Sequence, residues 1–392
     1  MTLGERLDAA TGHLPAPLVV VDLDALEANA DDLVRRAAGT PVRVASKSVR
    51  VRAVLEAVLA RPGFAGVMAY SVREAVWLAR QGVDDVLVGY PSVDTGGLDE
   101  LAADPVAAAA VTLMVDDVAQ ADLAAKAAAA HGSALRVCLD VDASLRVGAG
   151  PLRAHLGVRR SPVHTPAEAE ALAQAVVQRD GLSVRGVMFY EAQVAGLPDT
   201  SAAVRLVKRL SVRDLARRRA LVVDAVTQAT GARLELVNSG GSGSVETSVS
   251  DPTVTEVTAG SGLFVPTLFD GYRAFEPRPA AYFGLDVVRV PAPGYATTSG
   301  GGYIASGPPT ASRQPRPVWP AGLALTSREG AGEVQTPLRV PARADVRVGD
   351  RVWFRHAKAG EVMERFADVH LVRGEAVERT VPTYRGEGRT FG

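Results

Sequence analysis

Eight short apolar runs alternate with alanine-rich helical stretches between about residues 40 and 260. Two strands that pair in parallel need a crossover between them, so this alternation predicts a parallel sheet. Eight units in roughly 230 residues match an α/β fold, the (β/α)8 TIM barrel. A doubly wound open sheet is the alternative, although no Gly-x-Gly-x-x-Gly follows the first run. The predicted strands are 43–46, 66–70, 85–90, 111–115, 135–141, 184–190, 234–238 and 254–258.

The sequence changes in character after about residue 275. Helical stretches vanish, and the short apolar runs that follow are separated by Gly and Pro, which predicts an all-β domain. The opening run Leu18–Asp22 precedes the barrel units and can add a strand to that domain, with Asp24 as N-cap of the next helix. We expect a barrel domain at 23–272 and a β-rich domain made of 1–22 and 273–392. The predicted C-terminal strands are 282–290, 322–326, 351–354 and 367–372.

Composition excludes several classes of function. The net charge of −1 gives no global field that would attract nucleic acid or an anionic membrane. The basic run Arg205–Arg219 is expected to be a solvated helix face, with nucleic-acid contact as the alternative. No stretch approaches the ~20 apolar residues of a spanning helix, and the N-terminus lacks an apolar signal core. The single cysteine, Cys138, lies in an apolar run and fits a buried structural role in a reducing compartment. We expect a cytoplasmic protein that acts on a small molecule.

Lysine is scarce in this chain. Of 43 lysines and arginines, only Lys47, Lys126, Lys208 and Lys358 are lysine. Arginine keeps its proton near neutral pH, whereas a desolvated lysine can lose it and form a Schiff base. Lys47 follows the first predicted strand, and barrel enzymes place their reactive groups at the C-terminal ends of the strands. Because Lys126 and Lys208 have ordinary helical settings, Lys47 is the candidate catalytic amine.

Glycine and serine gather after the last two predicted barrel strands. The seventh strand leads into Asn238–Ser244 and the eighth into Gly260-Ser-Gly262. Glycines let backbone amides converge on an oxygen anion, and barrels often bind phosphate groups after strands seven and eight. A flexible turn is the alternative explanation. A phosphate cradle facing a lone lysine is the arrangement that pyridoxal phosphate (PLP) needs, because the lysine forms the imine and the cradle anchors the phosphate.

Several ordered segments together resemble the fold-type III PLP enzymes, in the branch of D-threonine aldolase and D-serine dehydratase. The resemblance covers almost the whole chain. It implies an alanine racemase-like barrel, a C-terminal β domain, a small amino-acid substrate and a head-to-tail homodimer. The segments are 17–26 (PLVVVDLDAL), the strand that leads to Lys47, 140–148 (DVDASLRVG), 189–193 (FYEAQ) and the serine–glycine loop.

The resemblance implies a role for each candidate residue. Lys47 would carry the Schiff base and act as a base on one face of the cofactor ring. Arg146 would contact the phenolic oxygen of PLP, and Tyr190 would lie by the pyridine nitrogen. The alternative for Arg146 is an ion pair with Asp140 or Asp142, and the alternative for Tyr190 is an aromatic cap on the barrel core. The implied phosphate neighbourhood is Ser239, Gly240, Gly241, Ser242, Gly243, Ser244, Gly260 and Ser261.

Two positions depart from the family pattern. The family motif Tyr-x-Gly-His, whose histidine is a candidate proton-transfer residue, here ends in Gln193, which can only orient a substrate or a water. The family's metal-binding His-x-Cys or His-x-Asp pair here reads His356-Ala-Lys358. We expect the Lys358 ammonium to take the place of the cation, so that no divalent metal is needed. The alternatives are a metal held by His356 and Glu361, and a turn that merely faces solvent.

These departures favour cleavage of D-3-hydroxy-amino acids of the D-threonine type to glycine and an aldehyde, with His356 as the base at the β-hydroxyl. A D-serine or D-threonine dehydratase, which releases ammonia and a 2-keto acid, is the second alternative because loss of hydroxide benefits from a Lewis acid. An amino-acid racemase needs a second base opposite Lys47 and is the third. A PLP carrier without catalysis and a metal-dependent barrel hydrolase complete the alternatives.

Overall fold

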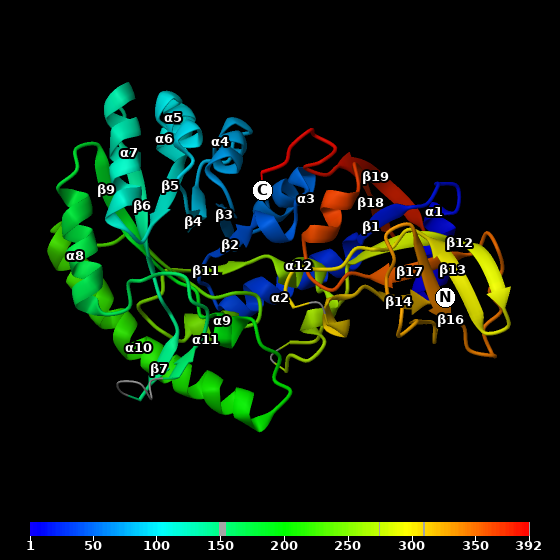
Figure 1. The fold of residues 1–392 in the computed structure, drawn as a ribbon. Helices are drawn as coiled ribbons and strands as arrows, with labels where there is room; N and C mark the ends of the chain where they lie inside the picture. The colour runs from blue at the N-terminus through cyan, green and yellow to red at the C-terminus, as the bar shows by residue number, and fades with distance from the viewer. Residues whose placement is uncertain (149–153, 274, 309, 392) are drawn as a thin grey trace.

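A closed barrel of eight parallel strands and a separate nine-stranded sheet make up the molecule (Figure 1). The computed structural model describes residues 1–148, 154–273, 275–308 and 310–391. All eight predicted runs overlap strands of the barrel, and the predicted fold class is confirmed. The barrel strands are β2 (Val42–Ala45), β3 (Phe64–Ala69), β4 (Val86–Pro91), β5 (Val111–Val115), β6 (Leu135–Val141), β9 (Leu182–Phe189), β10 (Leu236–Ser239) and β11 (Glu256–Ala259).

Helices surround the barrel, and the strands run in the order β10-β11-β2-β3-β4-β5-β6-β9. Several helices begin where a short polar side chain accepts a hydrogen bond from an amide of the first turn, as Ser71, Asp117 and Thr165 do. The helices are α2 (Leu23–Ala37), α3 (Arg52–Leu59), α4 (Val72–Arg80), α5 (Thr95–Ala103), α6 (Pro105–Ala110), α7 (Val118–His131), α8 (Pro166–Val177), α10 (Ala202–Thr230), α11 (Val245–Val249) and α12 (Ser261–Phe264).

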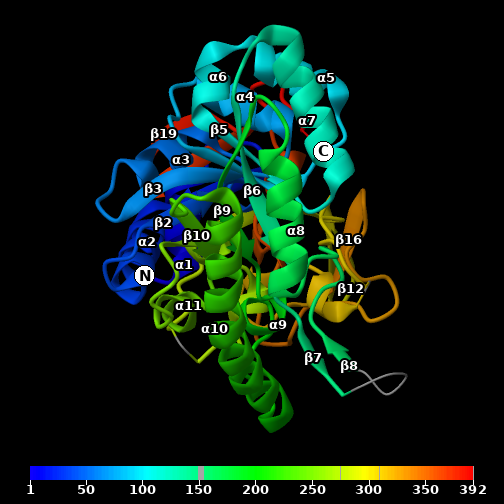
Figure 2. The same cartoon turned by 90° about the vertical axis from the view of Figure 1, so that its left-hand side faces the viewer.

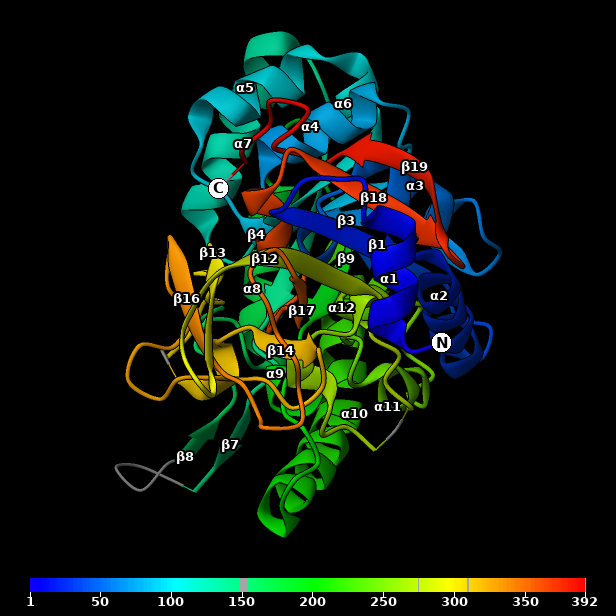
Figure 3. The ribbon, with the colours of Figure 1, turned by 90° about the vertical axis from the view of Figure 1, so that its right-hand side faces the viewer.

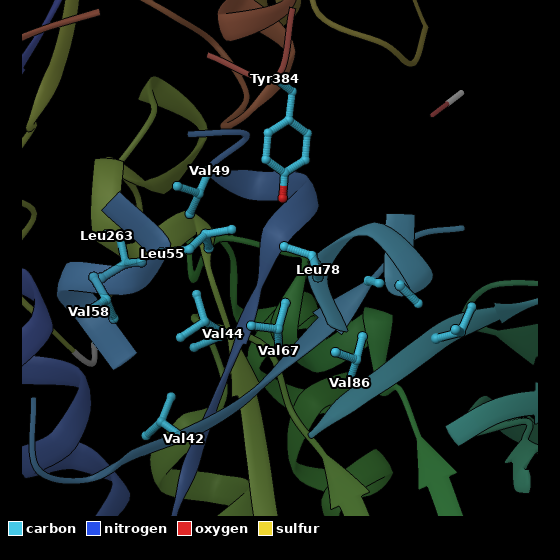
Figure 4. Close-up of a cluster of buried hydrophobic side chains, with 14 of the residues drawn as sticks. Val42, Val44, Val49, Leu55, Val58, Val67, Leu78, Val86, Leu263 and Tyr384 are labelled. Carbon is cyan, nitrogen blue, oxygen red and sulfur yellow. The ribbon is translucent and has the colours of Figure 1, made fainter. Parts of the chain in front are cut away.

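The barrel core is packed in layers. Inside the ring lies an apolar cluster that contains Leu87, Met114, Cys138 and Leu236, so the expected burial of Cys138 is confirmed. Outside the ring, strand residues such as Val44 pack against the surrounding helices, and Tyr384 from the C-terminal segment joins this layer (Figure 4). The barrel therefore has a filled interior, and its buried polar side chains are hydrogen-bonded to one another, as Arg43 and Asn238 are to Glu256.

The β-rich part is built from segments near both ends of the sequence (Figure 3). Strand β1 (Leu18–Asp22) pairs antiparallel with β12 (Ala281–Ala292) and parallel with β18 (Asp368–Arg373). The N-terminal run therefore lies inside a sheet whose other strands come from the last third of the chain. Those strands are β13 (Tyr295–Ser299), β14 (Arg316–Trp319), β15 (Ala324–Leu325), β16 (Gln335–Arg339), β17 (Arg351–Arg355) and β19 (Ala376–Pro382).

Three local features differ from the sequence predictions. The N-cap of α2 is Asp22, whose carboxylate accepts from two amides of the first turn, and not Asp24. Helix α1 (Leu3–Thr11) begins the chain, and the hairpin of β7 (Leu145–Val147) and β8 (Ala154–Leu156) projects from the barrel near α10 (Figure 2). Neither had a periodic signal long enough to predict. No helix in the described part of the chain is both long and apolar enough to cross a membrane.

Candidate active site

Lys47 lies at the C-terminal end of β2, in the single 3-10 turn Ser46–Ser48. Its Nζ donates to the Tyr90 hydroxyl at the end of β4, at 2.5 Å. Its carbonyl accepts a hydrogen bond of 3.2 Å from Nε of Arg50. A Cβ at Gly360 would lie 1.9 Å from the same carbonyl, so the turn after β17 packs directly on the Lys47 main chain and requires glycine there. The amine is thus aimed into the barrel mouth from a segment held on both sides.

Arg160 is a residue of this mouth that the sequence did not single out. Its guanidinium lies 5.9 Å from the ring centre of Tyr90 and 5.2 Å from that of Tyr190. Burial raises the pKa of the Tyr190 hydroxyl. It also raises the pKa of Asp140 to about 7, with a further contribution from the Asp116 carboxylate. In a chain with 43 lysines and arginines, no sequence signal separates this arginine from the rest.

Arg146 lies on the projecting hairpin and forms an ion pair with Asp142, at 2.6 Å. This is the alternative that the sequence left open, and contact of Arg146 with a cofactor stays a prediction. Burial favours a raised pKa for the Asp142 carboxyl, but hydrogen bonds from His164, Ser144 and Arg146 outweigh it and lower that pKa. The ionised Asp142 therefore holds Arg146 in place.

Gln193 is buried in the short helix α9 (Ala192–Ala195). Its Nε2 donates to the carbonyl of Ala143 at 2.7 Å, while its Oε1 makes no hydrogen bond within the described residues. The side chain therefore ties α9 to the loop after β6 and keeps one acceptor free. That geometry suits the orienting role expected of a residue that cannot exchange a proton.

The serine–glycine loops divide into two groups. Ser239, Gly240 and Ser244 donate to the buried carboxylate of Glu191, which also receives the hydroxyl of Ser248. Ser242 instead faces β11, where its Oγ accepts from the amides of Gly260 and Gly262 at 3.2 and 2.8 Å. The hydroxyl of Ser48 lies 3.0 Å from that of Ser261. Of the eight predicted phosphate residues, Ser242, Gly260 and Ser261 thus lie together beside the Lys47 turn.

Close packing explains why two of these positions are glycine. A Cβ at Gly243 would lie 2.3 Å from the Tyr272 ring, and one at Gly260 would lie 2.7 Å from the carbonyl oxygen of Ala45. The hydroxyls of Ser48, Ser242 and Ser261 form a donor set at one end of the barrel, next to the Lys47 turn. An anionic phosphate that carries an amine-reactive group fits this set of residues, because serine hydroxyls can turn to donate to it.

His356 and Lys358 line a second hollow, where the turn after β17 meets the Lys47 segment. This junction cavity has a volume of about 340 Å³, and its walls include Arg50, Tyr303 and Arg385. His356 is 2% exposed, and neither of its ring nitrogens makes a hydrogen bond in the described chain. Burial, with the Arg355 guanidinium, lowers the pKa of His356 to about 4. The imidazole is therefore neutral near pH 7 and keeps a free acceptor.

Lys358 sits at the rim of the junction cavity. Its ammonium contacts the Ser306 hydroxyl and lies 3.2 Å from the Glu361 carboxylate. Glu361 also accepts from the amide of Ser306 at 2.7 Å, so its oxygens are engaged away from His356. Within the described ranges, no three His, Cys, Asp or Glu side chains are grouped to hold a metal ion. His356 and Lys358 both line the junction cavity, while the Lys47 amine points to Tyr90; the catalytic roles of His356 and Lys358 stay predictions.

Comparison with known proteins gives matches in sequence and in structure. Residues 21–267 match the family model described as "Alanine racemase, N-terminal domain". A 3-hydroxy-D-aspartate aldolase of Paracoccus denitrificans (strain Pd 1222) is 30% identical over 266 residues, which are 64% of this chain and 61% of that protein. A second protein of that description from Paracoccus denitrificans is 33% identical over 189 residues, 47% of this chain and 44% of that one. The match thus spans less than two thirds of each relative.

Two solved structures show the same overall architecture. A D-threonine aldolase from Filomicrobium marinum superposes with a TM-score of 0.77 at 22% identity, covering 95% of this chain and 96% of that one. A D-threo-3-hydroxyaspartate dehydratase from Delftia sp. HT23 superposes with a TM-score of 0.72 at 21% identity, covering 94% and 97%. At such identities the likeness establishes the fold alone, and one fold hosts many reactions.

Proposed function

The chain belongs to the alanine racemase N-terminal domain family, which is PLP-dependent, and on that premise we propose that it is a lyase. The proposed reaction cleaves D-3-hydroxy-amino acids between the α- and β-carbons to give glycine and an aldehyde. The family resemblance inferred from the motifs is confirmed, and distant relatives include aldolases and dehydratases of D-3-hydroxy-amino acids. The choice of reaction is our own proposal.

The placement of the Lys47 amine carries this proposal. It lies at the mouth of a parallel barrel, beside Tyr90 and on the same turn as Ser48, whose hydroxyl meets that of Ser261. PLP supplies an amine-reactive carbonyl and a ring that withdraws electrons from bonds at the α-carbon. In our proposal, Lys47 supplies the amine, Ser48, Ser242 and Ser261 hold the phosphate, and Tyr90 orients the amine through its hydrogen bond.

His356 supports aldol cleavage over other reactions of the same cofactor. Breaking the bond to the β-carbon requires that a proton leave the β-hydroxyl. A pKa of about 4 keeps the His356 imidazole neutral at pH 7, so one of its ring nitrogens, which make no hydrogen bond within the described residues, can accept from a hydroxyl. We assign it that acceptor role, with the Lys358 ammonium polarising the substrate from the cavity rim. That both sequence relatives are described as aldolases also favours this reaction.

The junction cavity favours an acidic substrate among the candidates. Its lining includes four cationic side chains, Arg50, Lys358, Arg365 and Arg385, against the two carboxylates of Glu361 and Glu364. A substrate with a second carboxylate would meet a net positive wall there. We therefore place 3-hydroxy-D-aspartate beside D-threonine and D-phenylserine as substrates to be tested.

Product analysis tests the proposed reaction. We expect the PLP-loaded protein to release glycine and an aldehyde (glyoxylate from 3-hydroxyaspartate), measured by chromatography, and borohydride to fix the cofactor on Lys47. Ammonia and a 2-keto acid would instead identify a dehydratase. If neither set of products forms from any D- or L-3-hydroxy-amino acid, the lyase proposal is wrong.

Metal dependence is tested on the same preparation. With the Lys358 ammonium in place of a cation, we expect a chelator to change the rate less than about twofold. Loss of activity on chelation, restored by a divalent ion, would overturn this part of the proposal. A homodimer is proposed on the family resemblance, and sedimentation of the PLP-loaded protein checks it.

A further inference from the structure

Glu191 receives hydrogen bonds from four different residues. Its Oε2 accepts from the hydroxyl of Ser239 at 3.0 Å and the amide of Gly240 at 3.1 Å. Its Oε1 accepts from the hydroxyls of Ser244 and Ser248 at 3.0 and 2.6 Å. The side chain is 3% exposed, and it directly follows Tyr190, one of the aromatic residues of the barrel mouth. An ionised carboxylate offers about four acceptor positions, so this one is saturated by the protein itself.

These four donors belong to both ends of one loop. Ser239 is the last residue of strand β10 and Gly240 follows it, whereas Ser244 precedes α11 and Ser248 lies within it. The Glu191 carboxylate therefore holds the two ends of the segment 239–248 together and fixes the conformation of the loop between them. Ser242 lies in the middle of that segment, where its Oγ accepts from the amides of Gly260 and Gly262 after the neighbouring strand β11, and its carbonyl accepts from Arg36.

Helix α10 braces the same loop. Arg219 donates to the Ser239 hydroxyl at 2.9 Å, and its other guanidinium nitrogen pairs with Asp251 just beyond α11. Ser239 thus lies between an arginine and Glu191. Because these groups are buried, loss of the carboxylate would leave several donors without a partner, and the loop would have to move to satisfy them.

We propose that Glu191 is a positioning residue that sets the affinity for the phosphate-bearing cofactor by fixing the shape of the loop 239–248. It acts through the placement of Ser242, because its own oxygens are occupied by hydrogen bonds from the protein. The inference rests on the proposed function in one respect, that the group bound at this loop is PLP. Ser239, Ser244 and Ser248 then fix the conformation of the loop, and Ser242 binds the phosphate.

Three variants separate this role from others. Glu191→Gln keeps the volume but replaces half of the acceptor positions by an amide that donates. Ser248→Ala removes a single donor and is the milder change. Ser250→Ala is the matched control, since its exposed hydroxyl bonds only the carbonyl of Thr247 at the end of the same helix.

The readouts are the PLP dissociation constant, from titration of the cofactor-free protein, and kcat at saturating PLP. We expect Glu191→Gln to raise the dissociation constant about tenfold or more and Ser248→Ala to raise it less, while Ser250→Ala leaves it unchanged. With the cofactor saturating, kcat of all three should stay within about twofold of the original. Amide hydrogen exchange without PLP should be faster over 239–248 in Glu191→Gln.

Each contrary result overturns the inference in its own way. An unchanged dissociation constant in both Glu191→Gln and Ser248→Ala would show that the loop does not depend on the carboxylate. A normal dissociation constant with a reduced kcat would place Glu191 in the chemistry instead. If Glu191→Gln does not fold, Ser248→Ala decides. If the original protein binds no PLP, the proposed function fails, and hydrogen exchange alone decides whether Glu191 fixes the loop.

Discussion

Two buried carboxylates follow barrel strands, and they differ in how many hydrogen bonds they accept. Glu191, after β9, accepts hydrogen bonds from four residues. Glu74, in α4 after β3, is 0% exposed; its Oε2 accepts from the amide of Tyr70 at 2.7 Å, and its Oε1 makes no hydrogen bond among the described residues. Burial raises the pKa of Glu74 to about 7, although the hydrogen bond from the Tyr70 amide lowers it.

The polar groups near the two carboxylates also differ in whether they have hydrogen-bond partners. Among the described residues, the hydroxyls of Tyr70 and Tyr384 make no hydrogen bond, and neither do the ring nitrogens of His356, which lines the junction cavity. Arg50 connects them, because it lies over the Tyr70 ring, its carbonyl accepts from the amide of Tyr384, and it lines the junction cavity with His356. We call the Glu191 loop the matched side and this group the unmatched side. Matched polar groups build a scaffold, whereas unmatched ones mark the place for ligands and proton transfer.

Lys47 belongs to neither side, and its loss is the largest effect we expect. Lys47→Arg is similar in length but cannot supply a reactive amine, so kcat should fall by about 10³-fold or more. Borohydride labelling of the protein should be lost as well. Lys126→Arg, on the exposed face of α7, is the matched control. Full activity of the Lys47 variant would contradict the role of Lys47 as the reactive amine.

His356→Ala tests whether the unmatched side takes part in catalysis. The change removes the proposed acceptor of the hydroxyl proton, so kcat should fall about 10²-fold while the PLP dissociation constant stays the same. His131→Ala, on the surface of α7, should change neither. A variant that loses thermal stability but keeps kcat would show that the imidazole has only a packing role. The unmatched side would then have no demonstrated part in catalysis.

Glu74→Gln sharpens the comparison through pH. The folded-state pKa of Glu74 is about 7 against 4.5 when unfolded, so its contribution to stability is present below about pH 4.5 and lost as the pH rises through 7. At pH 8 the variant should therefore be more stable than the original by about 2 kcal/mol, with a smaller difference at pH 5. Urea unfolding at both pH values measures this. A constant difference would mean that Glu74 is not titrating in this range.

Lys358→Asp is expected to have the smallest effect on kcat, and a divalent cation should restore part of the lost activity. The change removes the ammonium and restores the His-x-Asp pair of the resembling family. Activity without metal should fall about tenfold, and a divalent cation such as Mn²⁺ should restore part of it. Lys358→Met, which offers no ligand, should lose activity without any response to the ion. Equal responses of both variants would contradict the replacement of a cation by Lys358.

The fold could be read from the sequence because its signals are local. Eight apolar runs at regular spacing leave few topologies open, and the glycines after β10 and β11 mark strand ends that any barrel of this kind exposes. Lys47 was recognised for a related reason, since scarcity made one amine visible. Helix α1 and several strands of the sheet were missed because their runs are short and polar on one face, which resembles loop sequence.

The contacts within the site could not be predicted from the sequence. Glu191 lies in a motif that was noticed for Gln193, and only the fold shows that its carboxylate gathers donors from residues 239–248. Arg160 follows β8 in the chain, and only the fold shows that its guanidinium lies near the rings of Tyr90 and Tyr190. Such contacts depend on which loops lie side by side in the folded protein, and residue type and spacing do not predict that.

Strand β1 ties the earliest part of the chain to nearly the latest. Val20 pairs with Tyr282 on one side and His370 on the other. At the usual rate of about 5–20 residues per second, a ribosome that has made Val20 needs roughly 20–70 s more to reach His370. All eight barrel strands lie between those two points and can close on the nascent chain first. The apolar strand β1 has neither of its neighbours in the sheet until β12 is made, and it gains the second only with β18.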